Sequence, residues 1–151
     1  MSARDRRLAA VRVLAHLHRM LESAEAGLTI PQYRMLAVLS EGGERSARVA
    51  QKLAVRKPTL TALADGLIAA GYAERESEPG DRRIVRLTLT DAGRAALARA
   101  DEAYLARLAP VLAELREPDR LVGDLIEVGE VLAARVRARV AAESAVAEPR
   151  P

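Results

Sequence analysis

The chain has 151 residues, half of them apolar and 30% charged, which is the composition of a soluble globular domain able to bury a core. It contains no cysteine, which excludes disulfides and thiolate sites, and no stretch approaches the roughly 18–20 apolar residues of a membrane span. Residues 44–99 hold 11 Lys and Arg against 7 Asp and Glu, so the net charge of +3 is concentrated there, either as a polyanion-binding patch or as an ordinary charged surface.

The N-terminal segment predicts a helix over residues 4–26, which Gly27 would stop. Its apolar side chains recur at helical spacing, at Leu8, Val11, Leu14, Ala15, Leu17 and Leu21. Polar side chains interrupt any apolar run of the kind found in a signal peptide, namely Arg12, His16, His18 and Arg19. We therefore expect a cytoplasmic protein with no membrane partner.

Three further helices are predicted before the middle of the chain. The second runs from Thr29, which has a glutamine at capping-box spacing, to about Glu41. Ser46 can cap a short third helix, and Pro58 suits the first turn of a fourth, which Gly71 ends. The fourth helix has an apolar stripe of Leu60, Leu63, Ala64, Leu67 and Ile68. Two short helices joined by a tight turn are the pattern of a helix-turn-helix.

The periodicity then changes from about 3.6 to 2 residues. Residues 73–77 predict a strand, residues 78–81 a turn, and residues 84–89 a second strand with one apolar face. A hairpin alone is marginally stable, so we expect it to lean on the helical core.

Two long helices are predicted in the remaining sequence. Thr90 ends the second strand and caps a helix that reaches about Arg116, with a kink at Pro110. Pro118 starts the last helix, which carries the apolar residues Leu121, Val122, Leu125, Ile126, Val128, Leu132, Val136 and Val140. Residues 143–151 are predicted to form a flexible tail.

The start of the fourth helix is strongly basic. In a helix-turn-helix these positions contact base edges in the major groove, and here they are Arg56, Lys57, Thr59 and Thr61. Cations at a helix N-terminus oppose the helix dipole, at roughly a few tenths of a kcal/mol each, and a DNA phosphate would offset this cost. The alternative is an ordinary amphipathic helix with a basic first turn.

The hairpin tip carries Asp81, Arg82 and Arg83, with Arg86 further along the strand. A thin β-ribbon with arginines can enter a minor groove, where a narrow width deepens the negative potential. Taken alone, this segment is better explained as a solvated turn whose acidic and basic groups neutralise each other.

The residues from Asp81 to Gly93 resemble the wing signature of the MarR family of bacterial transcriptional regulators. That signature is Asp-x-Arg, a strand, Leu-Thr, and a glycine one turn into the next helix. Residues 28–36 are similar to the opening of the family's second helix, and residues 55–67 to its recognition helix. The matches keep family order and spacing across about residues 28–97.

The resemblance implies a mainly α fold with a small β-hairpin wing. Residues 29–95 would form a winged helix-turn-helix, and residues 1–28 and 96–142 a helical dimerisation region. The protein would be a homodimeric, sequence-specific transcriptional repressor that binds double-stranded DNA at a pseudo-palindromic operator. A winged-helix module that binds proteins instead of a DNA sequence is the alternative.

The resemblance also implies roles for individual residues. Arg83 would enter the minor groove with Asp81 as its support, and Ser46 and Arg48 would lie near phosphates. A small-molecule effector could occupy a crevice lined by His16, Met20, Tyr33 and Tyr104, although core packing explains each of these residues more simply.

Two positions depart from the family pattern, because many relatives carry arginine where this chain has Ala62 and Gly66. Operator sequence and affinity therefore do not follow from the resemblance. His16 and His18 are two residues apart and would point about 200° away from each other on a helix, so no metal site is expected. With no phosphate-binding glycine loop and no nucleophile–base arrangement, we expect neither a cofactor nor an enzyme.

Overall fold

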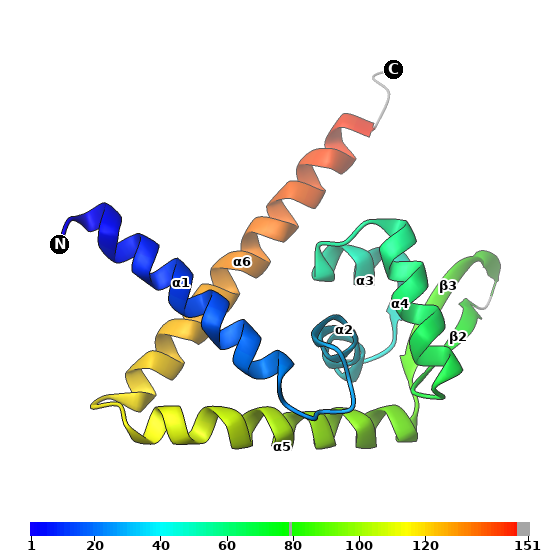
Figure 1. Ribbon diagram of the computed structural model, residues 1–151. Coiled ribbons are helices and arrows are strands. Elements are labelled where there is room, and N and C mark those ends of the chain that lie inside the picture. The colour runs from blue at the N-terminus through cyan, green and yellow to red at the C-terminus, as the bar shows by residue number, and fades with distance from the viewer. Residues whose placement is uncertain (79, 148–151) are drawn as a thin grey trace.

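The computed structural model describes residues 1–78 and 80–147, without the side chains of Arg82, Val140 and residues 143–147. Within these residues, six helices and three strands follow one another (Figure 1). They are α1 (Ala3–Glu22), α2 (Ile30–Ser40), β1 (Glu44–Arg45), α3 (Ser46–Leu53), α4 (Lys57–Ala69), β2 (Ala73–Glu78), β3 (Asp81–Leu89), α5 (Asp91–Ala113) and α6 (Pro118–Ala147). The mainly helical fold with a small β wing is confirmed.

Side-chain caps set the start of several helices. Thr29 and Gln32 form the predicted capping box of α2, in which Thr29 Oγ1 accepts from Gln32 N at 3.3 Å. Thr90 caps α5 in the same way, because its hydroxyl accepts from Gly93 N at 3.0 Å. The two caps fix where α2 and α5 begin, near the two ends of residues 29–95, which we call the winged unit.

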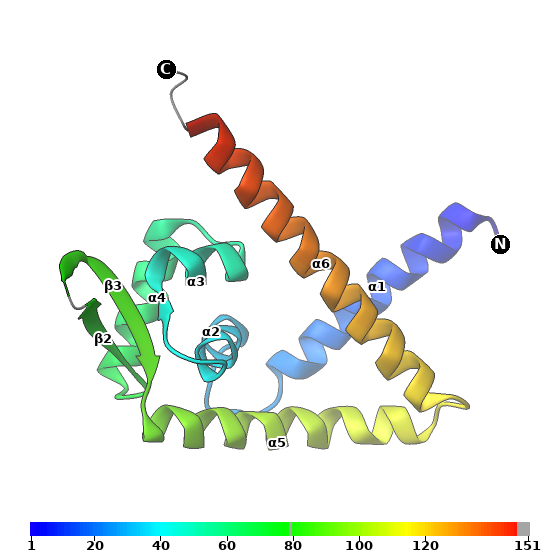
Figure 2. The same ribbon diagram turned by 180° about the vertical axis from the view of Figure 1, so that it is seen from behind.

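The wing is part of a three-stranded antiparallel sheet in the order β1-β3-β2, and is more than the predicted hairpin. Glu44 and Arg45 of β1 pair with Leu87 and Arg86 of β3. A two-residue strand shows no periodicity, so the sequence did not reveal it. Figure 2 shows β3 leading directly into α5.

The core lies in the winged unit, where α2, α3, α4 and the base of α5 pack against the sheet. Its buried residues are Met35, Leu36, Leu39, Val49, Leu53, Leu60, Ala64, Leu67, Ala73, Leu87, Leu89 and Ala96. A smaller cluster of Ala26, Ala100 and Tyr104 joins the α1–α2 loop to α5. The apolar stripe predicted for α4 is confirmed, with Leu60, Ala64 and Leu67 fully inside.

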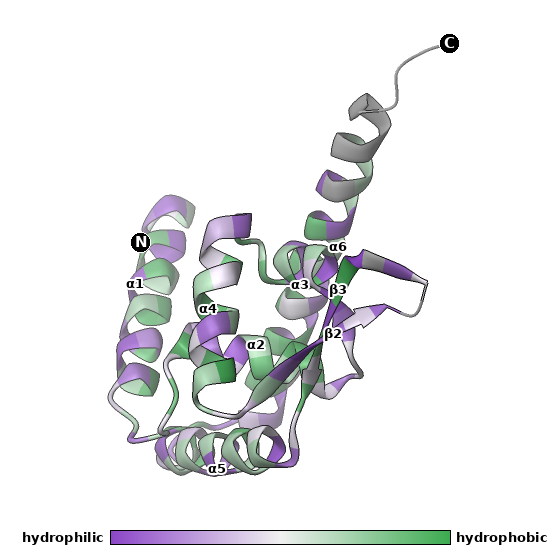
Figure 3. Cartoon of the chain, turned by 90° about the vertical axis from the view of Figure 1, so that its right-hand side faces the viewer, coloured by the Kyte–Doolittle hydropathy of each residue, from purple (hydrophilic) through white to green (hydrophobic). Residues whose placement is uncertain are grey.

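The helices at the two ends of the chain leave their apolar side chains uncovered. No residue of α1 is buried. Figure 3 shows α1 and α6 on opposite sides of the view, so these two helices do not cover each other along their length. The exposed large apolar residues of α1 and α6 are Leu8, Val11, Val13, Leu14, Val122, Leu125, Ile126, Val128, Val131 and Leu132.

Several predicted boundaries were wrong. The first helix ends at Glu22, before the predicted residue 26, because the Ser23 hydroxyl donates to the Met20 carbonyl and closes the last turn. Ser46 does not cap α3, since the N-cap residue is Arg45, which makes no side-chain capping bond. Helix α5 runs through Pro110 uninterrupted and ends at Ala113.

The last helix is longer than predicted. Helix α6 continues to Ala147, which is consistent with the helix propensity of its alanines and glutamate, and residues 148–151 of the predicted tail lie outside the described residues. Among the described helices, none combines the length and the apolar character needed to cross a bilayer.

Candidate nucleic-acid interface

Helices α3 and α4 are joined by a tight turn at Ala54, whose φ of 55° lies in the left-handed region. Val55 N donates to the Ala50 carbonyl at 3.0 Å and closes the turn. Leu53 and Leu60 are both buried in the same core, which fixes α4 relative to α3. The turn therefore presents the first residues of α4 at the surface.

All four residues predicted at the start of α4 are exposed, and two of them, Lys57 and Thr61, line the same hollow. Arg56 is the N-cap, without a side-chain bond to the helix, and Lys57 is the first helical residue. The Thr61 hydroxyl donates to the Lys57 carbonyl at 3.0 Å, so only its acceptor capacity and methyl group stay free for a partner. Thr59 is exposed on the same helix, about 200° around from Lys57, and Ala62 and Gly66 are exposed further along.

The wing residues differ in what they contact. Asp81 Oδ1 accepts from the backbone N–H of Arg83 at 2.9 Å, so Asp81 shapes the turn that carries Arg83. The Arg83 side chain is exposed. Arg86 Nη2 donates to the Gly43 carbonyl at 2.6 Å and ties β3 to the segment before β1. The predicted contact of Arg82 lies outside the described side chains.

A hollow of about 710 Å³ lies between α3, α4 and the wing, and we call it the basic hollow. Four cationic side chains line it, each from a different element: Arg45 of β1, Lys57 of α4, Arg75 of β2 and Arg83 of β3. Carboxylate side chains are absent from its lining residues, which are Arg45, Ser46, Ala47, Ala50, Lys57, Leu60, Thr61, Arg75, Arg83, Ile84 and Val85. The hollow thus lies between the start of α4 and the wing, the two basic segments that the sequence identified separately.

Two of these four cations are already paired with carboxylates. Arg45 donates to Glu78 through Nε at 3.0 Å and Nη2 at 2.7 Å, and this hydrogen bonding lowers the pKa of Glu78. Arg75 Nη2 donates to Asp65 Oδ1 at 2.7 Å, joining β2 to α4. Neither pair is visible in the sequence, because the partners lie far apart in the chain and β1 has no recognisable pattern.

The two residues predicted near phosphates on α3 do not share one site. The Ser46 hydroxyl donates to the Val85 carbonyl at 3.2 Å and ties α3 to β3 beside the basic hollow. Arg48 is exposed on α3 but lines a different cavity.

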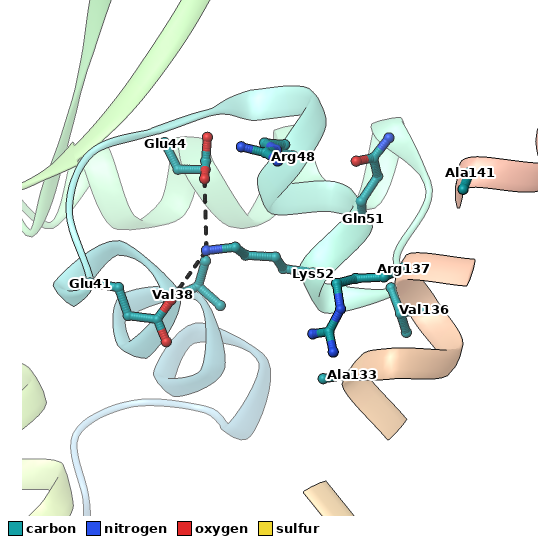
Figure 4. Close-up of a pocket in the computed structure, with 10 residues that line it drawn as sticks. All are labelled: Val38, Glu41, Glu44, Arg48, Gln51, Lys52, Ala133, Val136, Arg137 and Ala141. Carbon is teal, nitrogen blue, oxygen red and sulfur yellow. Dashed lines mark hydrogen bonds and ion pairs between the residues drawn. The ribbon is translucent and has the colours of Figure 1, made fainter. Parts of the chain in front are cut away.

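That second cavity, which we call the α6 cavity, has a volume of about 760 Å³ and lies between α2–α3 and α6 (Figure 4). Its lining residues are Val38, Glu41, Glu44, Arg48, Gln51, Lys52, Ala133, Val136, Arg137 and Ala141. Lys52 Nζ lies 3.1 Å from Glu41 and 3.7 Å from Glu44. Within the described side chains, Arg48 and Arg137 have no carboxylate partner.

The predicted effector crevice is only partly assembled. Tyr33 and Tyr104 make an edge-to-face contact with ring centroids 4.8 Å apart, and the Tyr33 hydroxyl donates to Asp101 at 2.7 Å. Burial and this bond raise the pKa of Tyr33 to about 12. His16 is exposed on α1 and Met20 half-buried, and none of the four residues lines either the basic hollow or the α6 cavity.

Comparisons with known proteins agree with this geometry. The MarR family profile matches residues 26–84. The HTH-type transcriptional repressor YetL of Bacillus subtilis is 25% identical over 112 residues, which are 69% of this chain and 67% of YetL. The B. subtilis repressor MdtR is 36% identical over 76 residues, 49% of each chain. The solved structure of the transcriptional repressor CouR bound to a 23-mer DNA duplex matches with a TM-score of 0.72 at 30% identity, covering 82% of this chain and 89% of CouR.

Proposed function

The chain belongs to the MarR family of transcriptional regulators, and we propose that it acts as a homodimeric repressor that binds a pseudo-palindromic DNA operator. The basic hollow is the observation that carries this proposal. It lies between a helix start that fits a major groove and a β-ribbon that fits a minor groove, and cations from both line it. The DNA complex of CouR supports the same use of this fold.

The residues divide into groups that bind bases and groups that bind the backbone. The exposed first turn of α4 would enter the major groove, where Arg56 and Lys57 can donate to guanine and Thr59 can contact a thymine methyl. Arg83 would enter the adjacent minor groove from the wing, on the turn that Asp81 shapes.

Dimerisation is proposed for residues 1–28 and 96–142, with residues 29–95 as the DNA-binding unit. The large apolar side chains of α1 and α6 are uncovered, in a pattern too extensive for an isolated chain in water. A second copy would cover them, and closed two-fold pairing would supply two winged units for two operator half-sites.

We also propose that an organic anion modulates DNA binding from the α6 cavity. This cavity has the volume of a small-molecule site and combines apolar groups with Arg48 and Arg137, which have no carboxylate partner among the described side chains. The two carboxylates that line it, Glu41 and Glu44, are both paired with Lys52. It joins α3 of the DNA-binding unit to α6, so a ligand held there would favour one arrangement of the two. The crevice predicted from the sequence, which includes Tyr33, is better explained as packing, because Tyr33 is already in contact with Asp101 and Tyr104.

A protein-interaction module is the alternative function. Such a module has no need for basic residues at both the start of α4 and the wing, whereas a DNA-binding unit needs both. The shared hollow that Lys57 and Arg83 line therefore favours DNA.

Recovery of bound genomic DNA followed by anisotropy titration would test the repressor proposal. We expect a strong preference for the recovered sequence over random duplex, and a linear fall of log affinity with log salt. Arg83→Ala should weaken operator binding, whereas Arg120→Ala on α6, whose partner is Glu117, should leave it unchanged. Equal affinity for random duplex would contradict sequence-specific binding.

The effector proposal is tested separately with benzoate as the probe. We expect benzoate to bind by calorimetry and to change operator affinity, and Arg137→Ala to weaken that binding without changing operator affinity in its absence. Binding that Tyr33→Phe abolishes and Arg137→Ala leaves intact would place the ligand in the other crevice.

A further inference from the structure

The four cations of the basic hollow are not equivalent. Lys57 and Arg83 have no ion-pair partner among the described side chains, and their charges are available to a polyanion. Arg45 and Arg75 are each held by a carboxylate that lies outside the hollow, Glu78 and Asp65 respectively. Half of the positive charge facing the hollow is therefore neutralised within the chain.

Both ion pairs are open to solvent, which limits what they contribute to folding. The exposed fraction is 42% for the Arg75 side chain and 56% for Asp65, and the pair of Arg45 with Glu78 is also accessible. Exposed ion pairs add little to stability, because solvent screens them and two long side chains lose freedom. Stability alone is a weak reason for placing two carboxylates beside a DNA-binding surface.

We propose that Asp65 and Glu78 are specificity-determining residues that lower the affinity for non-operator DNA by holding Arg75 and Arg45 in ion pairs. This inference rests on the proposed DNA-binding function. Non-specific affinity arises from the phosphates that cations neutralise and from the counterions that DNA then releases. A carboxylate 2.7 Å from a guanidinium competes with a phosphate for that guanidinium.

Operator binding depends less on these two arginines. Sequence is identified by contacts to base edges, which here would come from the first turn of α4 and from Arg83. Neutralising Arg45 and Arg75 thus lowers the phosphate-dependent affinity, which is the same for every DNA sequence. The affinity from base contacts, which differs between sequences, is kept. The ratio of operator to random affinity rises as a result.

The test uses Asp65→Asn and Glu78→Gln, which remove the charge and keep the shape, with the full-length protein and a random-sequence duplex. Freeing one arginine should make the slope of log affinity against log salt steeper by about 0.9, because one more phosphate is neutralised. Between 50 and 200 mM salt this adds roughly a threefold loss of affinity. At the lowest salt both variants should bind random duplex more tightly than the wild type.

Glu74→Gln is the matched control. Glu74 is the neighbour of Arg75 on β2, is exposed, and points to the opposite face of the strand from Arg75. It removes the same charge without freeing an arginine of the hollow, so its slope should equal that of the wild type. The double variant Asp65→Asn/Arg75→Gln should also return to the wild-type slope.

A purely structural role for the two pairs predicts a different result. If Asp65 and Glu78 only hold the wing in place, both variants will bind random duplex less tightly, with an unchanged or shallower slope, and the inference is wrong. An equal increase in slope for Glu74→Gln would also overturn it. These measurements need only random duplex, so they remain informative if the wild type has no preferred operator.

Discussion

Gly93 lies in the first turn of α5, where the chain passes against the backbone of Tyr72. A Cβ atom at this position would overlap the Tyr72 carbonyl oxygen and contact Leu89 at 2.8 Å. That carbonyl also accepts a hydrogen bond from Thr90 N at 3.1 Å, so it cannot move away without cost. The family glycine is therefore a packing requirement at the joint between the wing and α5.

Gly93→Ala should lower the free energy of unfolding by about 1–3 kcal/mol, the usual cost of overpacking a filled site. Gly66→Ala is the control, because a Cβ there meets only Gln32 Nε2 at 3.9 Å. Alanine is the better helix former, so Gly66→Ala should raise stability by up to about 1 kcal/mol. Urea unfolding of both variants checks the pair, and equal effects would contradict the packing argument.

Tyr33 gives the protein a pH dependence at the alkaline end. Its folded pKa of about 12 lies above the value of about 10 for a free tyrosine, because burial and the bond to Asp101 favour the neutral phenol. The corresponding stabilisation is complete below pH ~10 and is lost as the pH rises towards ~12.

We expect the ultraviolet absorbance of tyrosinate to show a component in the folded protein that titrates near pH 12 and that Tyr33→Phe removes, whereas Tyr104, whose pKa burial also raises, titrates late in both proteins. The fall of unfolding free energy above pH ~10 should also be smaller in that variant. Tyr72→Phe is the control, since Tyr72 lies in the winged unit and makes no contact with Asp101. A component near pH 12 that survives Tyr33→Phe would assign it to another tyrosine.

At the scale of elements, the turn between α3 and α4 sets the angle of the helix-turn-helix. Ala54 adopts the left-handed conformation there, which is unfavourable for a residue with a Cβ. Ala54→Gly should raise the free energy of unfolding by up to about 1 kcal/mol, less the entropy that glycine adds to the unfolded chain. Thermal unfolding checks this, with Ala47→Gly inside α3 expected to be destabilising.

Caps and stops predicted the helices well, because these signals are local. Thr29, Thr90 and Pro58 each act within one turn of the helix they begin, and the structure confirms all three. Strand β1 could not be predicted, because Glu44 and Arg45 become a strand only through their pairing with β3. Ser46 was assigned to a cap for the same reason, since its actual acceptor is Val85 on that distant strand.

The two parts of the basic hollow were predictable to different degrees. Lys57 and Arg83 carry local patterns, a basic helix start and a wing turn, so the sequence indicated them as candidates. Arg45 and Arg75 were missed because their place depends on tertiary contacts with Glu78 and Asp65.

At the scale of the whole molecule, the uncovered faces of α1 and α6 are the surfaces on which the proposed dimer rests. Leu132→Glu places a charge on the exposed apolar face of α6 and should convert the proposed dimer into monomers. Ala134→Glu adds the same charge about 200° around the helix and should leave the dimer intact. Sedimentation equilibrium measures both, and a monomeric wild type would contradict the dimer.

Because Thr90 alone connects the wing to α5, a tilt of α5 would also displace the wing. One residue separates β3 from α5, and its hydroxyl donates to Gly71 O at 2.7 Å while accepting from Gly93 N, so these bonds tie the base of the wing to the helix. The 23 residues of α5 span about 35 Å at ~1.5 Å per residue. A tilt of about 10° at the far end would move the wing by about 6 Å, more than the ~3.4 Å rise of one base pair. A small rotation of α5 where it meets α6 would therefore displace the wings of the proposed dimer so far that they no longer match the spacing of two operator half-sites.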